Sequence, residues 1–318
     1  IFAHEHSKAN WPELLRQARS KQYRAGGPLP PKFIAAVAEG IPNEHRAHAW
    51  MLLSGAETRR DAQPRLYQRL VSAPASAKVR DSIELDVRRT FPENPRLTAE
   101  FVEKLRRVLL AYAKRNPEVA YCQGMNFVAA ALLLFIEEEE DAFWLLAHIV
   151  EEVLPDHYVQ SMIGHTVDRQ VTEQLVELHL PALSEHLRDL GLSMPFITTQ
   201  WFLCLFVSSV PAETAFRLWD LILCHDPTWQ FRASLALFAM MEAQELLEAT
   251  DLATAVFVIK SATRAAFDAT EVIALAQERF ADVTPEMVYR LRRDWRRTTM
   301  EAMHAKLRIK ELYEAQRE

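Results

Sequence analysis

Glycine is scarce in this sequence, with 7 residues in 318, where a typical protein of this length has about three times as many. Loops that hold phosphates or dinucleotides need glycine at several fixed positions, because only glycine lets the backbone come close to the phosphate. Neither G-x-G-x-x-G nor G-x-x-x-x-G-K-S/T occurs in the chain. The sequence therefore excludes a nucleotide site built on either motif.

Cysteine is scarce as well, and the three cysteines (Cys122, Cys204 and Cys224) are far apart, within or beside apolar sequence. No C-x-x-C pair is present, and three cysteines cannot pair completely. This usage is typical of a reducing, intracellular environment. We therefore expect a cytoplasmic location.

Long hydrophobic runs are missing too. The longest, residues 127–136 and 201–207, are well short of the roughly 20 residues that span a bilayer, so we expect no membrane insertion. The net charge of −6 does not favour nucleic acid as the main partner. With 49% hydrophobic and 25% charged residues, the composition predicts a globular chain with a sizeable core. Because the chain begins at Ile1 and ends in a charged helical pattern, we also expect it to be a fragment.

Most of the chain has the hydrophobic spacing of helices. Phe101, Leu105, Val108 and Tyr112 recur at the spacing of one face of an amphipathic helix, and residues 127–136 are apolar all round, which predicts a buried helix. No stretch shows the sustained alternation of a strand. We therefore predict an all-α fold of about fifteen helices. The later helices are expected at residues 142–153, 168–178, 183–190, 195–208, 212–224, 231–249, 252–265, 271–280 and 285–316.

Two helical halves with a groove between them are the expected architecture. The segment from Pro155 to Gly164 interrupts the helical pattern, and we place the boundary after residue 160. On this division, residues 1–39 form an N-terminal helical extension, residues 40–160 the N-terminal half and residues 161–318 the C-terminal half.

The first candidate motif is G-I-P-N-E-H-R-A-H-A-W at residues 40–50. Pro42 can begin a helix, and Arg46 and Trp50 then lie one turn apart on one face. An arginine beside a tryptophan usually has a structural role, through a cation–π contact and burial of its aliphatic stem. Taken alone, this motif predicts packing.

The second candidate motif is I-E-L-D-V-R-R-T-F-P at residues 83–92. Pro92 disfavours helix at the residue before it, so Arg89 is expected at a helix end, where its side chain can reach outward. Asp86 lies three residues earlier on the same side and can orient Arg89 through a charge-assisted hydrogen bond. Taken alone, such a pair is typical of a surface salt bridge.

The third candidate motif, Y-C-Q-G at residues 121–124, directly precedes the apolar helix expected at 127–136. The Gln123 amide, beside Gly124 at a helix entrance, can project into a groove. Because an amide both donates and accepts hydrogen bonds, it can hold a water molecule. Taken alone, this motif is a loop with a polar residue.

In this order, R-x-x-x-W, I-x-x-D-x-x-R and Y-x-Q-G resemble the three signature motifs of the TBC domain, a family of helical GTPase-activating proteins for Rab-type small GTPases. The resemblance continues in D-A-F-W at 141–144, W-F-L at 201–203 and F-R-L-W-D at 216–220, and it covers at least residues 40–240. One departure is visible: family members often carry a glycine after the W-D segment, where this chain has C-H-D-P at 224–227.

The resemblance implies roles for individual residues. Arg89 matches the arginine finger and Gln123 the glutamine finger, both supplied in trans to the GTP that the Rab protein holds. Asp86 matches the motif aspartate and is expected to orient Arg89 or the local backbone, while the first motif is expected to shape the groove. The remaining supporting residues of the three motifs are Arg46, Trp50, Tyr121 and Gly124.

The resemblance also implies a partner, a Rab-family small GTPase in its GTP-bound state, which would itself hold GTP and Mg²⁺. The chain would need no cofactor or metal of its own and would be an activator rather than an enzyme. We expect a monomer that acts in vesicle traffic, in the cytoplasm or peripherally at endomembranes. Because both fingers are intact, we expect an active member rather than a silent Rab-binding scaffold.

Two further alternatives are weaker. A helical metal-dependent phosphohydrolase would use the His225-Asp226 doublet with ligands such as His148, His157 and His165, but their spacing matches no metal site. Nucleic-acid binding would use the basic residues between 290 and 297, but the glutamates that follow favour a solvated helix face.

Overall fold

The computed structural model describes residues 8–19, 30–224, 226–243 and 245–315. Within these ranges every regular element is a helix and no strand is present, which confirms the predicted all-α fold. None of the described helices is long and apolar enough to cross a membrane.

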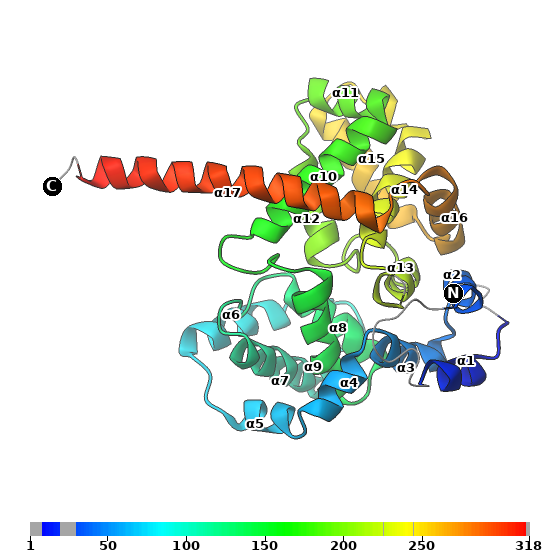
Figure 1. Cartoon of the computed structure of the whole chain (residues 1–318), viewed down its shortest axis with the longest axis vertical. Helices are drawn as coiled ribbons and strands as arrows, with labels where there is room; N and C mark the ends of the chain where they lie inside the picture. The colour runs from blue at the N-terminus through cyan, green and yellow to red at the C-terminus, as the bar shows by residue number, and fades with distance from the viewer. Residues whose placement is uncertain (1–7, 20–29, 225, 244, 316–318) are drawn as a thin grey trace.

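The helices form two bodies (Figure 1). The first body consists of α1 (Trp11–Ala18), α2 (Pro31–Glu39), α3 (Asn43–Leu53), α4 (Ala56–Ala62), α5 (Leu66–Ser72), α6 (Ala77–Val87), α7 (Ala99–Arg115), α8 (Met125–Phe135), α9 (Glu139–His148) and the π-helical turn η1 (Ile149–Val153). The second consists of α10 (Ile163–His179), α11 (Pro181–Asp189), α12 (Met194–Leu203), α13 (Ala212–Cys224), α14 (Trp229–Ala243), the 3₁₀ turn η2 (Leu246–Glu248), α15 (Leu252–Ala265), α16 (Ala269–Arg279) and α17 (Pro285–Ala315).

The apolar helix α8 lies in the core of the first body. Residues 128–132 are at most 1% exposed, and α8 packs against α6, α7 and α9, as well as α3. A helix that is hydrophobic on every face is stable only when helices surround it. The buried helix expected at 127–136 is therefore confirmed, and the residues just before it are held against the core.

The helix predicted over 195–208 is wrong at its C-terminal end, over residues 204–208, because α12 ends at Leu203. Leu205 and Phe206 have positive φ angles of 42° and 69°, which a helix does not tolerate. The Leu205 carbonyl accepts a hydrogen bond from Trp219 Nε1 at 2.7 Å. This tertiary contact holds the chain in a turn where apolar spacing alone predicts more helix.

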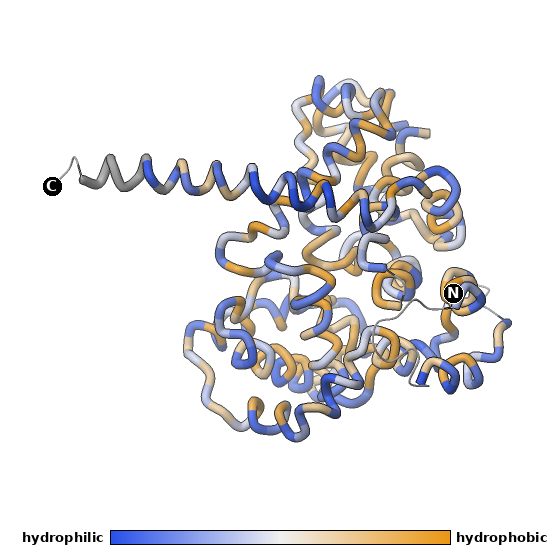
Figure 2. Tube along the Cα trace, in the orientation of Figure 1, coloured by the Kyte–Doolittle hydropathy of each residue, from blue (hydrophilic) through white to orange (hydrophobic). Residues whose placement is uncertain are grey.

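The two bodies meet at α13, which packs against α2 and α3 of the first body and against α14 and α16 of the second. Figure 2 shows hydrophobic residues along α13, whereas hydrophilic residues prevail along α17, which projects from the second body. The Asp220 carboxylate on α13 accepts hydrogen bonds from Trp50 Nε1 at 2.9 Å and from the Ile41 N–H at 3.3 Å. Arg46 Nε lies 3.3 Å from both of its oxygens.

The Arg46 guanidinium is fully buried and carries a second carboxylate partner on α13, Glu213, with Nη2 2.7 Å from Oε1. Burial raises the pKa of Asp220 to about 6 even though Arg46 opposes the shift. At pH 7 Asp220 is therefore mostly ionised and balances the buried positive charge. The first motif, expected to pack, joins the two bodies through this network.

The basic segment of α17 is partly buried in ion pairs. Arg292 Nε and Nη2 donate to Asp168 at 2.7 and 2.6 Å, and His157 Nε2 lies 3.1 Å from the same carboxylate. Although burial acts in the opposite direction, Arg292 and His157 hold the pKa of Asp168 well below its usual range. Arg296 pairs with Asp156 at 2.6 Å. The expectation of a solvated face therefore does not hold for Arg292, which anchors α17 to α10.

Trp50→Ala should lower the free energy of unfolding by about 3–5 kcal/mol, because it removes a fully buried ring and one donor to Asp220. Urea denaturation followed by circular dichroism measures the change. His48→Ala is the matched control, since His48 is exposed on the same helix and should change stability by less than about 0.5 kcal/mol. Equal stability of the two variants would contradict the role assigned to Trp50.

Candidate functional site

Arg89 lies in the turn directly after α6, and its side chain is 57% exposed. Ile83 and Val87 on α6 are buried, so the helix presents Arg89 outward while its apolar face packs inward. Arg89 Nε donates to Asp86 Oδ1 at 2.8 Å, and Nη2 lies 2.5 Å from the same oxygen. The guanidinium is thus oriented but remains accessible.

Asp86 links Arg89 to the third motif. Its side chain is only 7% exposed, and its other oxygen, Oδ2, accepts a hydrogen bond from the Tyr121 hydroxyl at 2.5 Å. Burial and the bond to Asp86 raise the pKa of Tyr121, so the phenol stays protonated and remains a donor. One carboxylate therefore fixes both the arginine and the start of the segment that carries Gln123.

A second chain of hydrogen bonds joins the same two segments. Thr90 Oγ1 donates to the Asp86 carbonyl at 2.7 Å, and Asn126 Nδ2 donates to Thr90 Oγ1 at 2.8 Å. The Asn126 side-chain oxygen accepts from the Gly124 N–H at 3.0 Å. Thr90 and Asn126 are buried, and the three motifs alone do not identify them as site residues. The signal available was their position, directly beside Arg89 and two residues after Gly124.

Gly124 makes the turn before α8 possible. Its φ of +109° is strained for any other residue, and a Cβ there would lie 2.9 Å from the Leu203 carbonyl oxygen. Gln123 directly precedes it, and the Gln123 side chain is exposed. Within the described part of the chain this amide has no hydrogen-bond partner. The turn therefore presents a polar group that is free to meet another molecule.

A groove runs between the two bodies beside Arg89, with a volume of about 440 Å³. From the first body its wall includes Arg89, Phe91, Pro92 and Phe127. From the second body the residues that line it are Gln200, Val207, Ser208, Ser209, Val210, Pro211, Arg264 and Phe267. The predicted groove between the halves is therefore present, and Arg89 stands at its edge.

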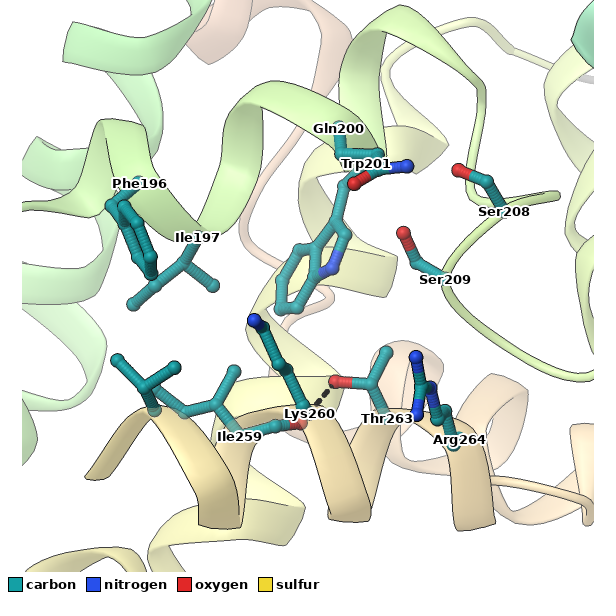
Figure 3. A pocket seen from close by; sticks show the side chains of 11 residues that line it. Phe196, Ile197, Gln200, Trp201, Ser208, Ser209, Ile259, Lys260, Thr263 and Arg264 are labelled. Carbon is teal, nitrogen blue, oxygen red and sulfur yellow. Dashed lines mark hydrogen bonds between the residues drawn. The ribbon is translucent and has the colours of Figure 1, made fainter. Parts of the chain in front are cut away.

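The groove continues into a second hollow of about 260 Å³ (Figure 3). The two hollows share Gln200, Ser208, Ser209 and Arg264. Figure 3 shows this second part between α12, which contributes Phe196 and Trp201, and α15, which contributes Lys260 and Arg264.

Arg46 and Trp50 do not line either hollow. Both side chains are fully buried, and their partners lie on α13, as described above. Arg46 stacks over Phe135, 5.7 Å from the ring centroid, rather than over Trp50. Any influence of the first motif on the groove therefore passes through the packing of the two bodies.

The described residues hold no group of three or more histidine, cysteine, aspartate or glutamate side chains that could bind a metal ion. His157 contacts Asp168, and His165 Nε2 lies 3.2 Å from Thr199 Oγ1. Burial lowers the pKa of His148 and of His165 to about 4 in each case, so both are neutral at pH 7. His225, the first residue of the candidate doublet, lies outside the described residues. The metal-dependent alternative gains no support here.

Comparisons with known proteins agree with the three motifs. The Rab-GTPase-TBC domain family matches residues 43–247. Growth hormone-regulated TBC protein 1-A of Danio rerio is 39% identical over 235 residues, which cover 73% of this chain and 66% of that protein. TBC1 domain family member 2B of Homo sapiens is 37% identical over 268 residues, which cover 80% of this chain but 27% of that protein. The chain thus spans just under two thirds of the first relative and about a quarter of the second.

Among solved structures, the Chlamydomonas flagellar RabGAP TBC domain superposes with a TM-score of 0.73 at 27% identity, covering 85% of this chain and 94% of that one. The family match spans well over half of the sequence and includes all three motifs, from Arg46 to Gly124. The chain therefore belongs to the Rab-GTPase-TBC domain family.

Proposed function

We propose that this chain accelerates GTP hydrolysis by a Rab-type small GTPase, to which it supplies Arg89 and Gln123. The observation that carries the proposal is the pairing of two exposed polar side chains on two turns that buried hydrogen bonds lock together. Catalytic groups brought to a partner must arrive in a fixed relative position, because misplacement by about 1 Å can cost about 100-fold in rate.

Arg89 would stabilise the transition state of phosphoryl transfer. Negative charge is spread over the γ-phosphoryl and leaving-group oxygens in that state. A planar guanidinium that is always charged neutralises this charge when the interface excludes water. Asp86 would act as a positioning residue, since it orients the guanidinium before the partner arrives.

Gln123 would position the attacking water. Its amide can accept a hydrogen bond from the water and donate one to a neighbouring oxygen. In many GTPases a glutamine of the GTPase performs this task. Here the exposed amide between Tyr121 and Gly124 would replace it in trans.

The remaining parts of the proposal rest on the family to which the chain belongs. GTP and Mg²⁺ would be held by the GTPase in its GTP-bound state, so the chain would contribute residues to another protein's active site without a cofactor of its own. We place it in the cytoplasm, as a monomer, peripheral to endomembranes through its partner, where it would regulate vesicle traffic.

Arg89→Ala should reduce the stimulated rate of GTP hydrolysis by a factor on the order of 10³ or more, which corresponds to about 4 kcal/mol of activation free energy. Arg89→Lys should restore little activity, because the planar fork is lost. Single-turnover hydrolysis across a panel of Rab-type GTPases measures the rate, and a melting curve checks the fold.

Arg88→Ala is the control, because Arg88 is also exposed and directly precedes Arg89. It should retain nearly full activity. An inactive Arg88 variant beside an active Arg89 variant would overturn the assignment. Binding of a GTP-loaded GTPase by the wild-type chain without any acceleration would instead identify a silent scaffold.

Gln123→Ala should lower the stimulated rate by a factor on the order of 10² and leave affinity for the GTPase nearly unchanged, because its contact matters mainly in the transition state. Replacing the GTPase's own water-positioning glutamine should then have little effect on that rate. GTP hydrolysis is measured for the four combinations of the wild-type or Gln123→Ala chain with the wild-type or glutamine-substituted GTPase.

The four combinations separate two roles. A structural Gln123 that only supports the start of α8 would cost about 1 kcal/mol of stability and lower activity only in proportion to the unfolded fraction. If substitution of the GTPase glutamine abolished stimulation while Gln123→Ala were tolerated, the glutamine finger would be excluded and the arginine finger alone would remain.

A further inference from the structure

The groove beside Arg89 is lined by positively charged side chains. The two connected hollows are lined by three cationic side chains, Arg89, Lys260 and Arg264, and by no aspartate or glutamate. The whole chain has a net charge of −6. Positive charge is therefore concentrated in the groove and opposes the overall charge of the protein.

Lys260 and Arg264 differ from Arg89 in one important respect. Arg89 has a carboxylate partner in Asp86, whereas neither Lys260 nor Arg264 forms an ion pair within the described part of the chain. They lie four residues apart on α15, where like charges face each other across one turn and slightly destabilise the helix. Among the described residues, no carboxylate lies within ion-pair distance of either charge, and only the C-terminal end of the α15 dipole favours Arg264.

Exposed aromatic rings flank the two cations. Phe196 on α12 is 62% exposed and Phe267, just after α15, is 49% exposed, and both line the groove. In Figure 3, Lys260 and Arg264 extend from α15 toward α12 and the segment that carries Ser208 and Ser209. Aromatic and arginine side chains are both enriched at protein–protein interfaces relative to the rest of a protein surface.

We infer that Lys260 and Arg264 form a recognition surface for acidic side chains that the GTPase presents beside its nucleotide site. This inference rests on the proposed function, because Arg89 at the edge of the groove brings the nucleotide site of the partner against the first body. The protein surface next to that nucleotide then meets α12 and α15. Lys260 and Arg264 select among GTPases by charge, and Phe196 and Phe267 supply apolar contact.

The role of the two cations differs from that of Arg89 and is measured by different quantities. Charges at the rim of an interface act mainly on the association rate and its salt dependence. A catalytic finger acts mainly on the rate once the complex has formed. The effects of substituting the two kinds of residue can therefore be told apart when binding and hydrolysis are measured independently.

The experiment uses a GTPase chosen from the panel by its affinity for the wild-type chain when loaded with a non-hydrolysable GTP analogue. Lys260→Glu and Arg264→Glu should each slow association by roughly tenfold at low salt, with the difference shrinking as salt is raised. The hydrolysis rate at saturating activator should stay close to wild type. Exchanging an acidic residue near the nucleotide site of the GTPase for lysine should restore association with the Arg264→Glu chain.

Arg69→Glu is the matched control, because Arg69 is exposed on α5, lines neither hollow and gives the same change in net charge. An effect of equal size in this control, or a loss of the saturated rate in the two groove variants, would overturn the inference. Salt-dependent self-association of the wild-type chain through the same residues would assign the groove to a second copy and would also overturn it.

These outcomes are distinct from those that test the proposed function. If the charge reversals weaken binding while the wild-type chain never accelerates hydrolysis, the recognition surface stands and the activator role fails. If Arg89→Ala abolishes acceleration while the reversals leave association unchanged, the activator role stands and the recognition surface fails. If the wild-type chain binds no GTPase of the panel, both are overturned.

Discussion

Asp220 carries its charge in the interior between the two bodies, where Arg46, Trp50 and the Ile41 N–H satisfy it from the first body. A buried charge that loses its partner costs about 3–5 kcal/mol, so the bodies cannot separate at α13 without a large loss of stability. The groove is a gap between these same bodies. The interaction that joins these bodies therefore lies within the core and not in the groove, and a preformed gap lowers the cost of ordering when a partner binds.

Asp86, like Asp220, is a carboxylate that holds separate segments of the chain together. A nearly buried carboxylate contacts both Arg89 and Tyr121, and Thr90 and Asn126 add a second, buried connection. The two exposed side chains stand on turns, which alone are the most mobile parts of a fold. Because the turns are tied to each other and to the buried helix α8, the exposed groups keep a fixed relative position.

Much of this arrangement can be predicted from the sequence, because helix periodicity and the three motifs are local patterns. The all-α fold, the buried helix α8 and the outward position of Arg89 all depend on residues within a few turns of each other. The predictions are wrong where a contact with a residue far away in the sequence determines the local structure. Trp219 donates a hydrogen bond to the Leu205 carbonyl, just after the end of α12, and Asp168 holds Arg292 in a partly buried ion pair. The local sequence predicts a longer helix at the first place and a solvated helix face at the second.

In the site as well, some features can be predicted from neighbouring residues, whereas others depend on residues far away in the sequence. Gly124 can be recognised from its motif, but the Leu203 carbonyl that excludes a Cβ there comes from the other body. Lys260 and Arg264 carry no motif at all, and only the fold brings α15 to the groove that Arg89 borders. Residues that act on chemistry common to a family recur in short patterns, whereas residues that choose between similar partners need only share a surface. In the roles proposed above, Arg89 and the Lys260–Arg264 pair would lie in one groove, so that the reaction and the choice of partner could vary independently.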